Sequence, residues 1–263
     1  VEIVIQSNTE LVGGAVADRI VSLVNYTPDA VIGLATGSTP LPVYQALRKR
    51  YEAGEVSFAS VQTFNLDEYA GLPADHPESY RSVIRAELTD HLDIPPASVH
   101  TPDGNAADLD RAAWEYEAAI HAAGEVDIQL LGIGQNGHIG FNEPGCSLAS
   151  RTRVEHLTAS TRAANARFFD GDISAVPERS ITQGLGTIMD ARHVILLAFG
   201  EQKADAVAQL VEGAVSARWP ATILQHHPHV TVIVDEAAAA KLTLLDYYRE
   251  AYELVRNAAG EDP

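Results

Sequence analysis

The chain has 263 residues, enough for one large domain or two small ones, and its 46% hydrophobic content supports a sizeable buried core. A formal net charge of −18 repels nucleic acid and anionic membranes over most of the surface, and no apolar run is long enough for a membrane helix, so we expect neither partner. The single cysteine, Cys146, rules out an internal disulfide framework and a cysteine-rich zinc site. With no secretory signal in residues 1–6, these features favour a cytoplasmic protein.

Apolar strands alternate with amphipathic helices along the chain. We expect strands at residues 1–5, 30–35, 61–66, 126–133, 194–199 and 230–234. Helices are expected from residue 8 onward, from residue 40 through Leu47, and at 79–91, 109–121, 202–211 and the acidic C-terminus. Continuous apolar strands separated by helices predict one α/β domain over residues 1–263. Its sheet should be doubly wound and mostly parallel, of a modified Rossmann-like kind, with helices on both faces.

In such sheets, ligands bind outside the carboxyl ends of the strands. The first unusual strand end is Thr-Gly-Ser-Thr-Pro at residues 36–40. Gly37 lets the backbone approach a ligand closely, Ser38 and Thr39 offer hydroxyls, and the next helix points its free N–H groups at the loop. These features predict a small phosphate cradle without the Gly-Lys-Ser/Thr of a P-loop. An ordinary capped helix start is the alternative.

A second strand end carries two carboxylates, Asp67 and Glu68, just before the loop at residues 70–79. An Asp at this place can act as a general base toward a ligand. The alternative is a turn or helix-capping Asp.

A third strand end, residues 132–143, contains a formal Gly-x-Gly-x-x-Gly at Gly132, Gly134 and Gly137. A dinucleotide fingerprint should open a helix, but the residues that follow are rich in turn formers and broken by Pro144, which argues against a nicotinamide-dependent oxidoreductase. We interpret this stretch as a loop that displays His138 and Glu143. A nearby carboxylate can fix the tautomer of a histidine and raise its pKa. A histidine without function on a surface loop remains the alternative.

A histidine cluster and the single cysteine predict neither a metal site nor a nucleophile. The cluster His-His-Pro-His at residues 226–229 precedes a strand, and its spacing matches no closed zinc site, so we expect no metal there. Cys146 has no basic neighbour that would make it a nucleophile.

Taken together, these motifs resemble the glucosamine-6-phosphate deaminase family. The matching stretches, which run in order from about residue 1 to residue 250, are GLATGSTP at 33–40, TFNLDEY at 63–69, HPESY at 76–80, GHIGFNEP at 137–144, SRTR at 150–153, RFF at 167–169 and GLGTIMDA at 184–191. The resemblance implies conversion of glucosamine 6-phosphate and water to fructose 6-phosphate and ammonia, in amino-sugar catabolism. It implies no metal or organic cofactor, and an amino-sugar phosphate as the small-molecule partner.

The resemblance also implies roles for individual residues. Asp67 would move a proton between C2 and C1 of the sugar, His138 would open the ring, and Glu143 would tune that histidine. Many members have Asp where this chain has Asn136, which can hydrogen-bond His138 but cannot stabilise its charged form, so we expect a lower pKa of His138 here. Phosphate would bind a set of loop residues and two cations: Thr36, Gly37, Ser38, Thr39, Arg167 and Lys203.

Residues 153–182 match the mobile, helical lid of the family and are referred to below as the lid segment. Hexameric members carry an activating site for N-acetylglucosamine 6-phosphate that uses an Arg, matched here by Arg153. This chain has Glu155 in place of a Lys and Cys146 in place of a Ser, and an acid repels an anionic effector. We therefore expect that activation to be absent or altered. Because the family includes monomers and hexamers, a homo-oligomer stays open.

Two other functions fit the same fold. The 6-phosphogluconolactonases usually have Asp-Glu-Arg after the second strand end and Gly-His-Thr in the histidine loop. This chain has Tyr69 and Ile139 at those positions. A sugar-phosphate-sensing module of a transcription regulator is the other alternative, and the presence of Asp67, His138 and Glu143 together argues for turnover instead.

Overall fold

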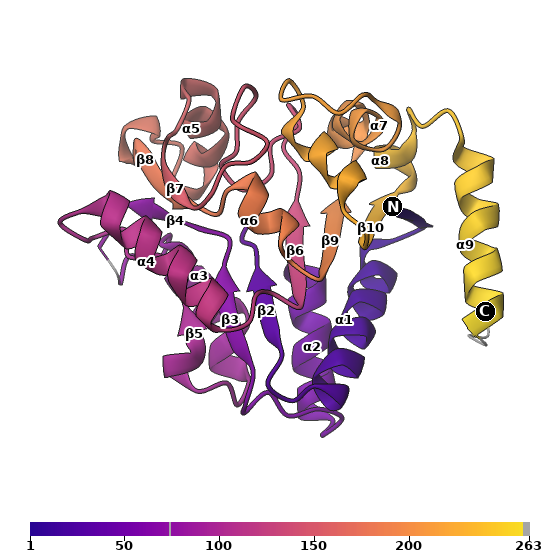
Figure 1. Ribbon diagram of the computed structural model, residues 1–263, viewed down its shortest axis with the longest axis horizontal. Coiled ribbons are helices and arrows are strands. Elements are labelled where there is room, and N and C mark those ends of the chain that lie inside the picture. Colours follow the sequence, from indigo (N-terminus) through magenta and orange to yellow (C-terminus); the bar gives the residue numbers. More distant parts are fainter. Residues whose placement is uncertain (74, 260–263) are drawn as a thin grey trace.

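A parallel sheet forms the centre of the protein, which we describe from a computed structural model over residues 1–73 and 75–259. Its strand order is β1-β10-β9-β6-β2-β3-β5, and every pairing is parallel (Figure 1). In that order the strands are Glu2–Gln6, Val230–Asp235, His193–Ala198, Ile128–Gly132, Val31–Leu34, Gln62–Asn65 and Val99–His100. The sequence-based strands are therefore confirmed within one or two residues at each end, and β5 is added at the edge.

Successive residues of the central strands enter two separate cores, one on each face of the sheet. In β9, Ile195 and Leu197 pack with one core, whereas Val194 and Leu196 pack with the other. The first core contains side chains of α1, α2 and α3, which span Thr9–Tyr26, Leu41–Glu52 and Tyr80–Glu87. The second contains side chains of α4, α6, α7 and α8, which span Leu109–Ala122, Leu185–Met189, Ala204–Glu212 and Glu236–Ala239. The doubly wound α/β fold is thus confirmed.

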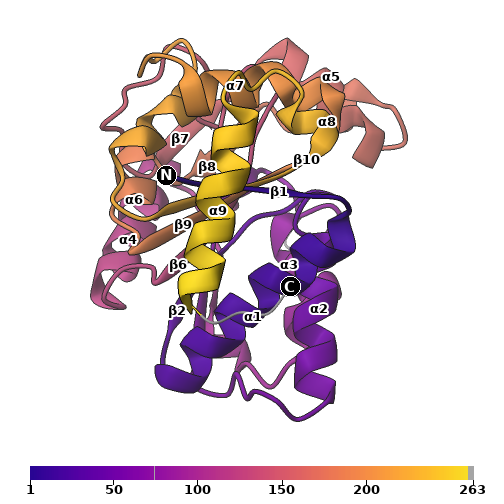
Figure 2. The ribbon, with the colours of Figure 1, turned by 90° about the vertical axis from the view of Figure 1, so that its right-hand side faces the viewer.

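The last helix, α9 (Leu245–Ala259), lies beside the edge strand β1 (Figure 2). An uncovered edge strand exposes unpaired backbone groups that can pair with another chain, and a helix placed there blocks such pairing. The helical C-terminus predicted from the sequence is confirmed as far as residue 259, and residues 260–263 lie outside the described part.

A second, smaller sheet lies above the carboxyl ends of the parallel strands. It is antiparallel, in the order β4-β8-β7, with strands Asp67–Ala70, Arg179–Thr182 and Arg153–His156. The lid segment is therefore not only helical, because it begins and ends with strands that flank α5 (Ala159–Asn165) and the short 3₁₀ turns Ala166–Phe168 and Ile173–Ala175. The loop expected at residues 70–79 also starts later than its polar sequence suggested, because Asp67–Ala70 pairs with β8.

Three predicted helix ends differ in detail. The helix expected at 79–91 ends at Glu87 and is followed by a separate 3₁₀ turn, Thr89–His91. The helix expected at 202–211 is preceded by a 3₁₀ turn, Glu201–Lys203. Pro40 is the residue that precedes α2, with αR dihedral angles, rather than its first helical residue.

Helices α1 and α2 approach each other closely at Gly13, where a Cβ atom would lie 2.5 Å from the carbonyl oxygen of Pro42. The next residue, Gly14, belongs to the same helix, and a Cβ there would meet no atom within 4 Å. The two glycines therefore separate the effect of packing from the effect of helix propensity.

We predict that Gly13→Ala destabilises the protein by about 1–3 kcal/mol, because the added methyl group forces α1 and α2 apart. The matched variant Gly14→Ala should stabilise the protein by up to about 1 kcal/mol through its better helix propensity. Urea unfolding of both variants measures the difference. A shift of the same sign and size in both would contradict a close contact at Gly13.

Candidate active site

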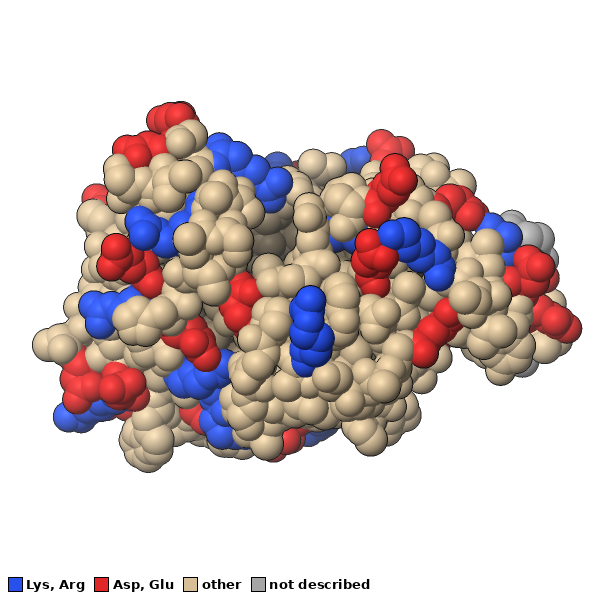
Figure 3. All heavy atoms as spheres, turned by 90° about the horizontal axis from the view of Figure 1, so that it is seen from above, with Lys and Arg blue, Asp and Glu red and all other residues tan. Residues whose placement is uncertain are grey.

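All the sequence-predicted site residues except Arg167 follow four strands that are neighbours in the sheet. Lys203 follows β9, the 136–143 loop follows β6, the 36–40 loop follows β2 and Asp67 follows β3. Parallel strands end at one edge, so these groups share one face of the molecule. Seen from above in Figure 3, this face has a hollow near its middle, with basic side chains beside it.

Asp67 is a buried carboxyl group, with 6% of the residue exposed. Burial, together with the negative charge of Glu68, raises its pKa to about 8. A carboxyl group that titrates near neutral pH is suited to take up and return a proton. The alternative of a helix-capping Asp is wrong, because Asp67 begins strand β4 and its backbone pairs with Thr182 of β8.

Glu68, the second carboxylate of the pair, is used in hydrogen bonds to the backbone. Its two oxygens accept hydrogen bonds from the backbone N–H groups of Tyr69, Tyr80 and Arg81, at 2.8, 2.9 and 2.9 Å. It therefore ties strand β4 to the first turn of α3. Its negative charge beside Asp67 also disfavours ionisation of that residue.

The glycine-rich stretch after β6 forms a turn and no helix, which confirms that it does not have the geometry of a dinucleotide-binding motif. The N–H of Gly134 donates to the carbonyl of His138 at 2.9 Å, and Gly137 has a φ of +82°. A Cβ on Gly134 would lie 2.2 Å from Cε1 of His138, so only glycine lets the ring lie against the turn. The glycines thus hold the imidazole at the strand end.

Three polar side chains of this loop form a connected group, referred to below as the histidine triad: His138, Asn136 and Glu143. Nδ1 of His138 lies 2.7 Å from Oδ1 of Asn136, and Nδ2 of Asn136 donates to Oε2 of Glu143 at 2.7 Å. Since the Asn136 amide nitrogen is used on Glu143, its oxygen accepts from the ring. The imidazole therefore carries its proton on Nδ1, and Nε2 is left to exchange protons with a ligand.

The pKa of His138 lies below its usual value, and the expectation that Asn136 lowers it relative to an Asp at that position stays a prediction. Burial is the main cause; Glu143 acts in the opposite direction, and the Lys203 cation lowers the pKa further. The nearest oxygen of Glu143 is 3.7 Å from Nδ1. At neutral pH the ring is thus a neutral acid–base group.

The loop after β2 keeps its hydroxyl groups away from helix capping. α2 begins after Pro40 with no side-chain hydrogen bond to its first turn, so the alternative of a Ser or Thr N-cap is wrong. Gly37 has a φ of +92°, a conformation that glycine adopts without strain. Ser38 is exposed and Thr39 is partly exposed, so both can reach a bound anion.

Two cations, Arg167 and Lys203, are close enough for the positive charge of Arg167 to lower the pKa of Lys203, although burial is the larger cause. Nζ of Lys203 donates to the carbonyl of Ile133 at 2.6 Å, which holds it beside the strand ends. Within residues 1–73 and 75–259, neither cation forms an ion pair with a carboxylate. Two mutually repelling, uncompensated cations favour the binding of an anion.

The sequence motifs assigned no role to two tyrosines, the buried Tyr69 and the partly buried Tyr80, which connect this loop to the lid segment. The Tyr80 hydroxyl hydrogen-bonds with both Thr36 and Tyr69, and the Tyr69 hydroxyl accepts from Nδ2 of Asn165 in α5 at 3.0 Å. Burial raises the pKa of Tyr69 to about 12 and raises that of Tyr80 well above its usual value. The aromatic residues of GFNEP and RFF, Phe141 and Phe169, pack against Tyr69.

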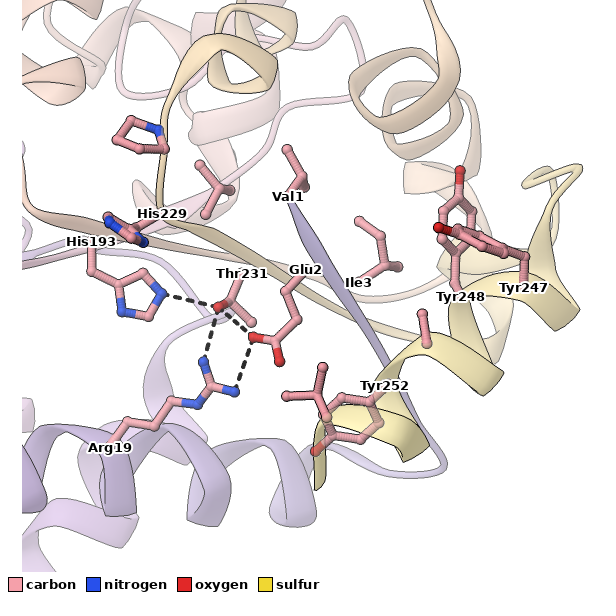
Figure 4. Close-up of a pocket in the computed structure, with 14 residues that line it drawn as sticks. Val1, Glu2, Ile3, Arg19, His193, His229, Thr231, Tyr247, Tyr248 and Tyr252 are labelled. Atoms are coloured by element: carbon pink, nitrogen blue, oxygen red, sulfur yellow. Dashed lines mark hydrogen bonds and ion pairs between the residues drawn. The ribbon is translucent and has the colours of Figure 1, made fainter. Parts of the chain in front are cut away.

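A separate cavity of about 560 Å³ lies between α9 and the starts of β1, β9 and β10, away from the strand ends (Figure 4). Four of its polar groups contact one another: Arg19 contacts Glu2 at 3.0 Å and Thr231 at 2.9 Å, and Thr231 contacts His193 at 3.0 Å. Burial and the Arg19 charge lower the pKa of His193 to about 4, so it is neutral at pH 7. None of the predicted site residues lines this cavity.

The histidine cluster at residues 226–229 and Cys146 lie outside the group of predicted site residues. His227 is buried and its Nε2 lies 2.6 Å from the carbonyl oxygen of Ala191. Among the described residues, no group of three His, Cys, Asp or Glu side chains is arranged to hold a metal ion. Burial raises the pKa of the Cys146 thiol. No helix within 1–73 and 75–259 has the length and apolar character needed to cross a membrane.

Arg153, matched above to the Arg of an activating site, is paired within its own strand. Its Nη2 lies 2.5 Å from Oε1 of Glu155, and its Nη1 donates to Oδ1 of the buried Asn142 at 2.9 Å. The guanidinium is therefore already engaged.

These features define a doubly wound α/β protein with an acid–base site at the carboxyl ends of its strands. Residues 7–233 match the family described as glucosamine-6-phosphate isomerases/6-phosphogluconolactonase, and the chain belongs to this family. Glucosamine-6-phosphate deaminases of Mycolicibacterium smegmatis and Streptomyces coelicolor are 59% and 57% identical, each over 95% of this chain and 96% of theirs.

Solved structures of the same family superpose on this chain as well. A monomeric glucosamine-6-phosphate deaminase superposes with a TM-score of 0.89 and 42% identity, over 92% of this chain and 100% of that protein. The 6-phosphogluconolactonase of Trypanosoma brucei superposes with a TM-score of 0.75 over 92% and 98%, but at 22% identity it shares only the fold.

The triad geometry predicts the effect of Asn136→Asp. A carboxylate 2.7 Å from Nδ1, and beside Glu143, favours the charged imidazole and should raise the pKa of His138 by about one unit or more. Titration of the His138 ring protons by NMR measures the shift. Asn136→Ala, which removes the acceptor without adding charge, is the control and should produce no such rise. An unmoved pKa in the Asp variant would show that Asn136 does not set it.

Proposed function

We propose that this protein is a glucosamine-6-phosphate deaminase, which converts glucosamine 6-phosphate and water to fructose 6-phosphate and ammonia. The observation that carries the proposal is the pairing of two acid–base groups at neighbouring strand ends: Asp67, with a pKa raised to about 8, and the neutral His138 of the histidine triad. The relatives at 57% and 59% identity, which match nearly the whole chain, support the same reaction.

In the proposed reaction, His138 opens the sugar ring. Its Nδ1 proton is held by Asn136, so Nε2 can take the proton of the O1 hydroxyl and return it to the ring oxygen O5. The bond between C1 and O5 breaks, and C1 becomes an aldehyde. Glu143 keeps Asn136, and through it the imidazole, in the required orientation.

Asp67 then moves a proton between neighbouring carbons. The carboxylate removes the proton from C2, which is acidified by the C1 carbonyl. The carbonyl oxygen takes up a proton from the ammonium group on C2, and a neutral enolamine forms. Return of the proton to C1 leaves an iminium group at C2, water adds to C2, and ammonia leaves to give the 2-ketone of fructose 6-phosphate. A buried carboxyl with a raised pKa holds and returns this proton without exchange with bulk water.

The substrate phosphate is proposed to bind at Thr36, Gly37, Ser38 and Thr39, with Arg167 and Lys203 supplying the positive charge. Support comes from the two uncompensated cations and from loop hydroxyls not used in capping. We further propose that the lid segment covers the bound sugar, because α5 and Arg167 are carried by it. The single cysteine and the metabolic substrate support a cytoplasmic setting.

The first test measures ammonia release from glucosamine 6-phosphate, with fructose 6-phosphate read in a coupled assay, for the parent and Asp67→Asn. The parent should turn over, and the variant should lose about 10²–10⁴-fold in kcat, because an amide of the same size cannot accept the C2 proton. Binding of glucosamine 6-phosphate to the variant, measured by calorimetry, is the control for folding.

The other outcomes of this assay point to different functions. Hydrolysis of 6-phosphogluconolactone without ammonia release would identify a lactonase. Binding of a sugar phosphate without turnover would identify a sensing module.

The pairing of Arg153 with Glu155 leads to a prediction about regulation. We propose that N-acetylglucosamine 6-phosphate does not activate the enzyme, because the anionic effector would have to displace Glu155 from the guanidinium. Substrate saturation curves with and without the effector should superpose. A curve made steeper at low substrate concentration by the effector would refute the proposal, and Glu155→Lys would then be the variant to compare.

A further inference from the structure

Helix α5 of the lid segment touches the site through two side chains, Thr161 and Asn165. They are four residues apart, so they project from the same side of the helix. Thr161 is buried and its hydroxyl donates to Oε1 of Glu143. Asn165 donates to the hydroxyl of Tyr69. On the other side of α5, Ala163 and Ala164 are exposed. One helix face therefore reaches both the histidine triad and the tyrosines behind the phosphate loop.

The hydroxyl of Thr161 is fixed in direction by the start of its own helix. Thr158 is the N-cap of α5, and its Oγ1 accepts the backbone N–H of Thr161 at 3.2 Å. The same Thr158 hydroxyl donates to Oγ1 of Thr161 at 3.0 Å. Because the oxygen of Thr161 receives that proton, its own proton is directed at Glu143.

The two oxygens of Glu143 have different partners. Oε2 accepts from Asn136, whereas Oε1 accepts from Thr161 and is also the oxygen 3.7 Å from Nδ1 of His138. The hydrogen bond from α5 thus engages the carboxylate oxygen that faces the imidazole. Among the described residues, Lys203 acts on the pKa of His138, and the pKa of the nearby Cys146 thiol is affected by Arg153, Glu155 and Glu143.

We propose that Thr161 is a positioning residue for the reaction, through which α5 sets the orientation and basicity of the histidine triad. By donating a hydrogen bond to Oε1, Thr161 weakens the attraction between that oxygen and Nδ1 of His138. The same hydrogen bond holds the carboxylate in the orientation in which Oε2 accepts from Asn136. Without this hydroxyl, Oε1 faces the ring with its full charge and can turn toward it, which favours the charged imidazole. The inference rests on the proposed role of His138 in ring opening.

The test compares Thr161→Val, which keeps the branched shape but removes the donor, with Thr161→Ser, which keeps the donor. The Val variant should lose about 10²-fold in kcat with little change in KM. In the absence of substrate, the NMR titration of His138 should move to higher pH by about half a unit or more. The Ser variant should restore both values to those of the parent.

Asn165→Leu is the matched control, because it removes one hydrogen bond between the same helix face and the body of the protein. If Thr161 and Asn165 only hold α5 against the body of the protein, Thr161→Val and Asn165→Leu should have the same effect on kcat and on KM. Neither variant should then shift the His138 titration. The inference predicts instead that Asn165→Leu raises KM and leaves the titration in place. It is overturned if the titration of Thr161→Val matches that of the parent. A loss in Thr161→Ser equal to that in Thr161→Val would overturn it as well, even if the Val variant were poorly folded.

The NMR titration needs no turnover, so it separates this inference from the proposed function. A parent that releases no ammonia from glucosamine 6-phosphate refutes the reaction. A shifted His138 titration in Thr161→Val would still show that α5 acts on the triad.

Discussion

The site depends on one geometric constraint, which is that parallel strands lying side by side must end at the same edge of the sheet. β9, β6, β2 and β3 are consecutive in the sheet, and each is followed by a different chemical group: a cation, an imidazole with its carboxylate, a hydroxyl-bearing turn and a buried acid. The apolar residues of these strands enter two cores, so the strand ends rest on rigid elements. Side chains held in this way need little rearrangement when a ligand binds.

Local charge, rather than net charge, decides what the site can hold. The whole chain carries −18, yet Arg167 lies close enough to Lys203 to act on its pKa, and neither cation forms an ion pair with a carboxylate of the described residues. Burial acts in opposite directions on the two acid–base groups, because it raises the pKa of Asp67 and lowers that of His138. Both groups therefore favour their neutral forms, so Asp67 would accept a proton through its ionised fraction, whereas the imidazole is neutral and free to exchange protons.

The parallel sheet and its strand-end motifs could be predicted from the sequence because their signals are local. Long apolar runs such as residues 194–199 and turn chemistry such as Thr-Gly-Ser-Thr-Pro need no knowledge of distant residues. The second sheet could not be predicted in this way. Its strands have polar sequences, Asp-Glu-Tyr-Ala, Arg-Val-Glu-His and Arg-Ser-Ile-Thr, and β4 and β8 pair although more than a hundred residues separate them. The contact of Thr161 with Glu143 depends on that pairing, so its only local sign is the four-residue spacing to Asn165.

The two attachments of α5 differ in how they respond to acid. The phenol groups behind Asn165 keep their protons far above neutral pH, so that end of the helix stays anchored whatever the medium. The Thr161 end contacts a carboxylate beside an imidazole, and both of these are ionisable groups. A proton taken up by the histidine triad therefore acts on the Thr161 end of α5 and leaves the Asn165 end unchanged.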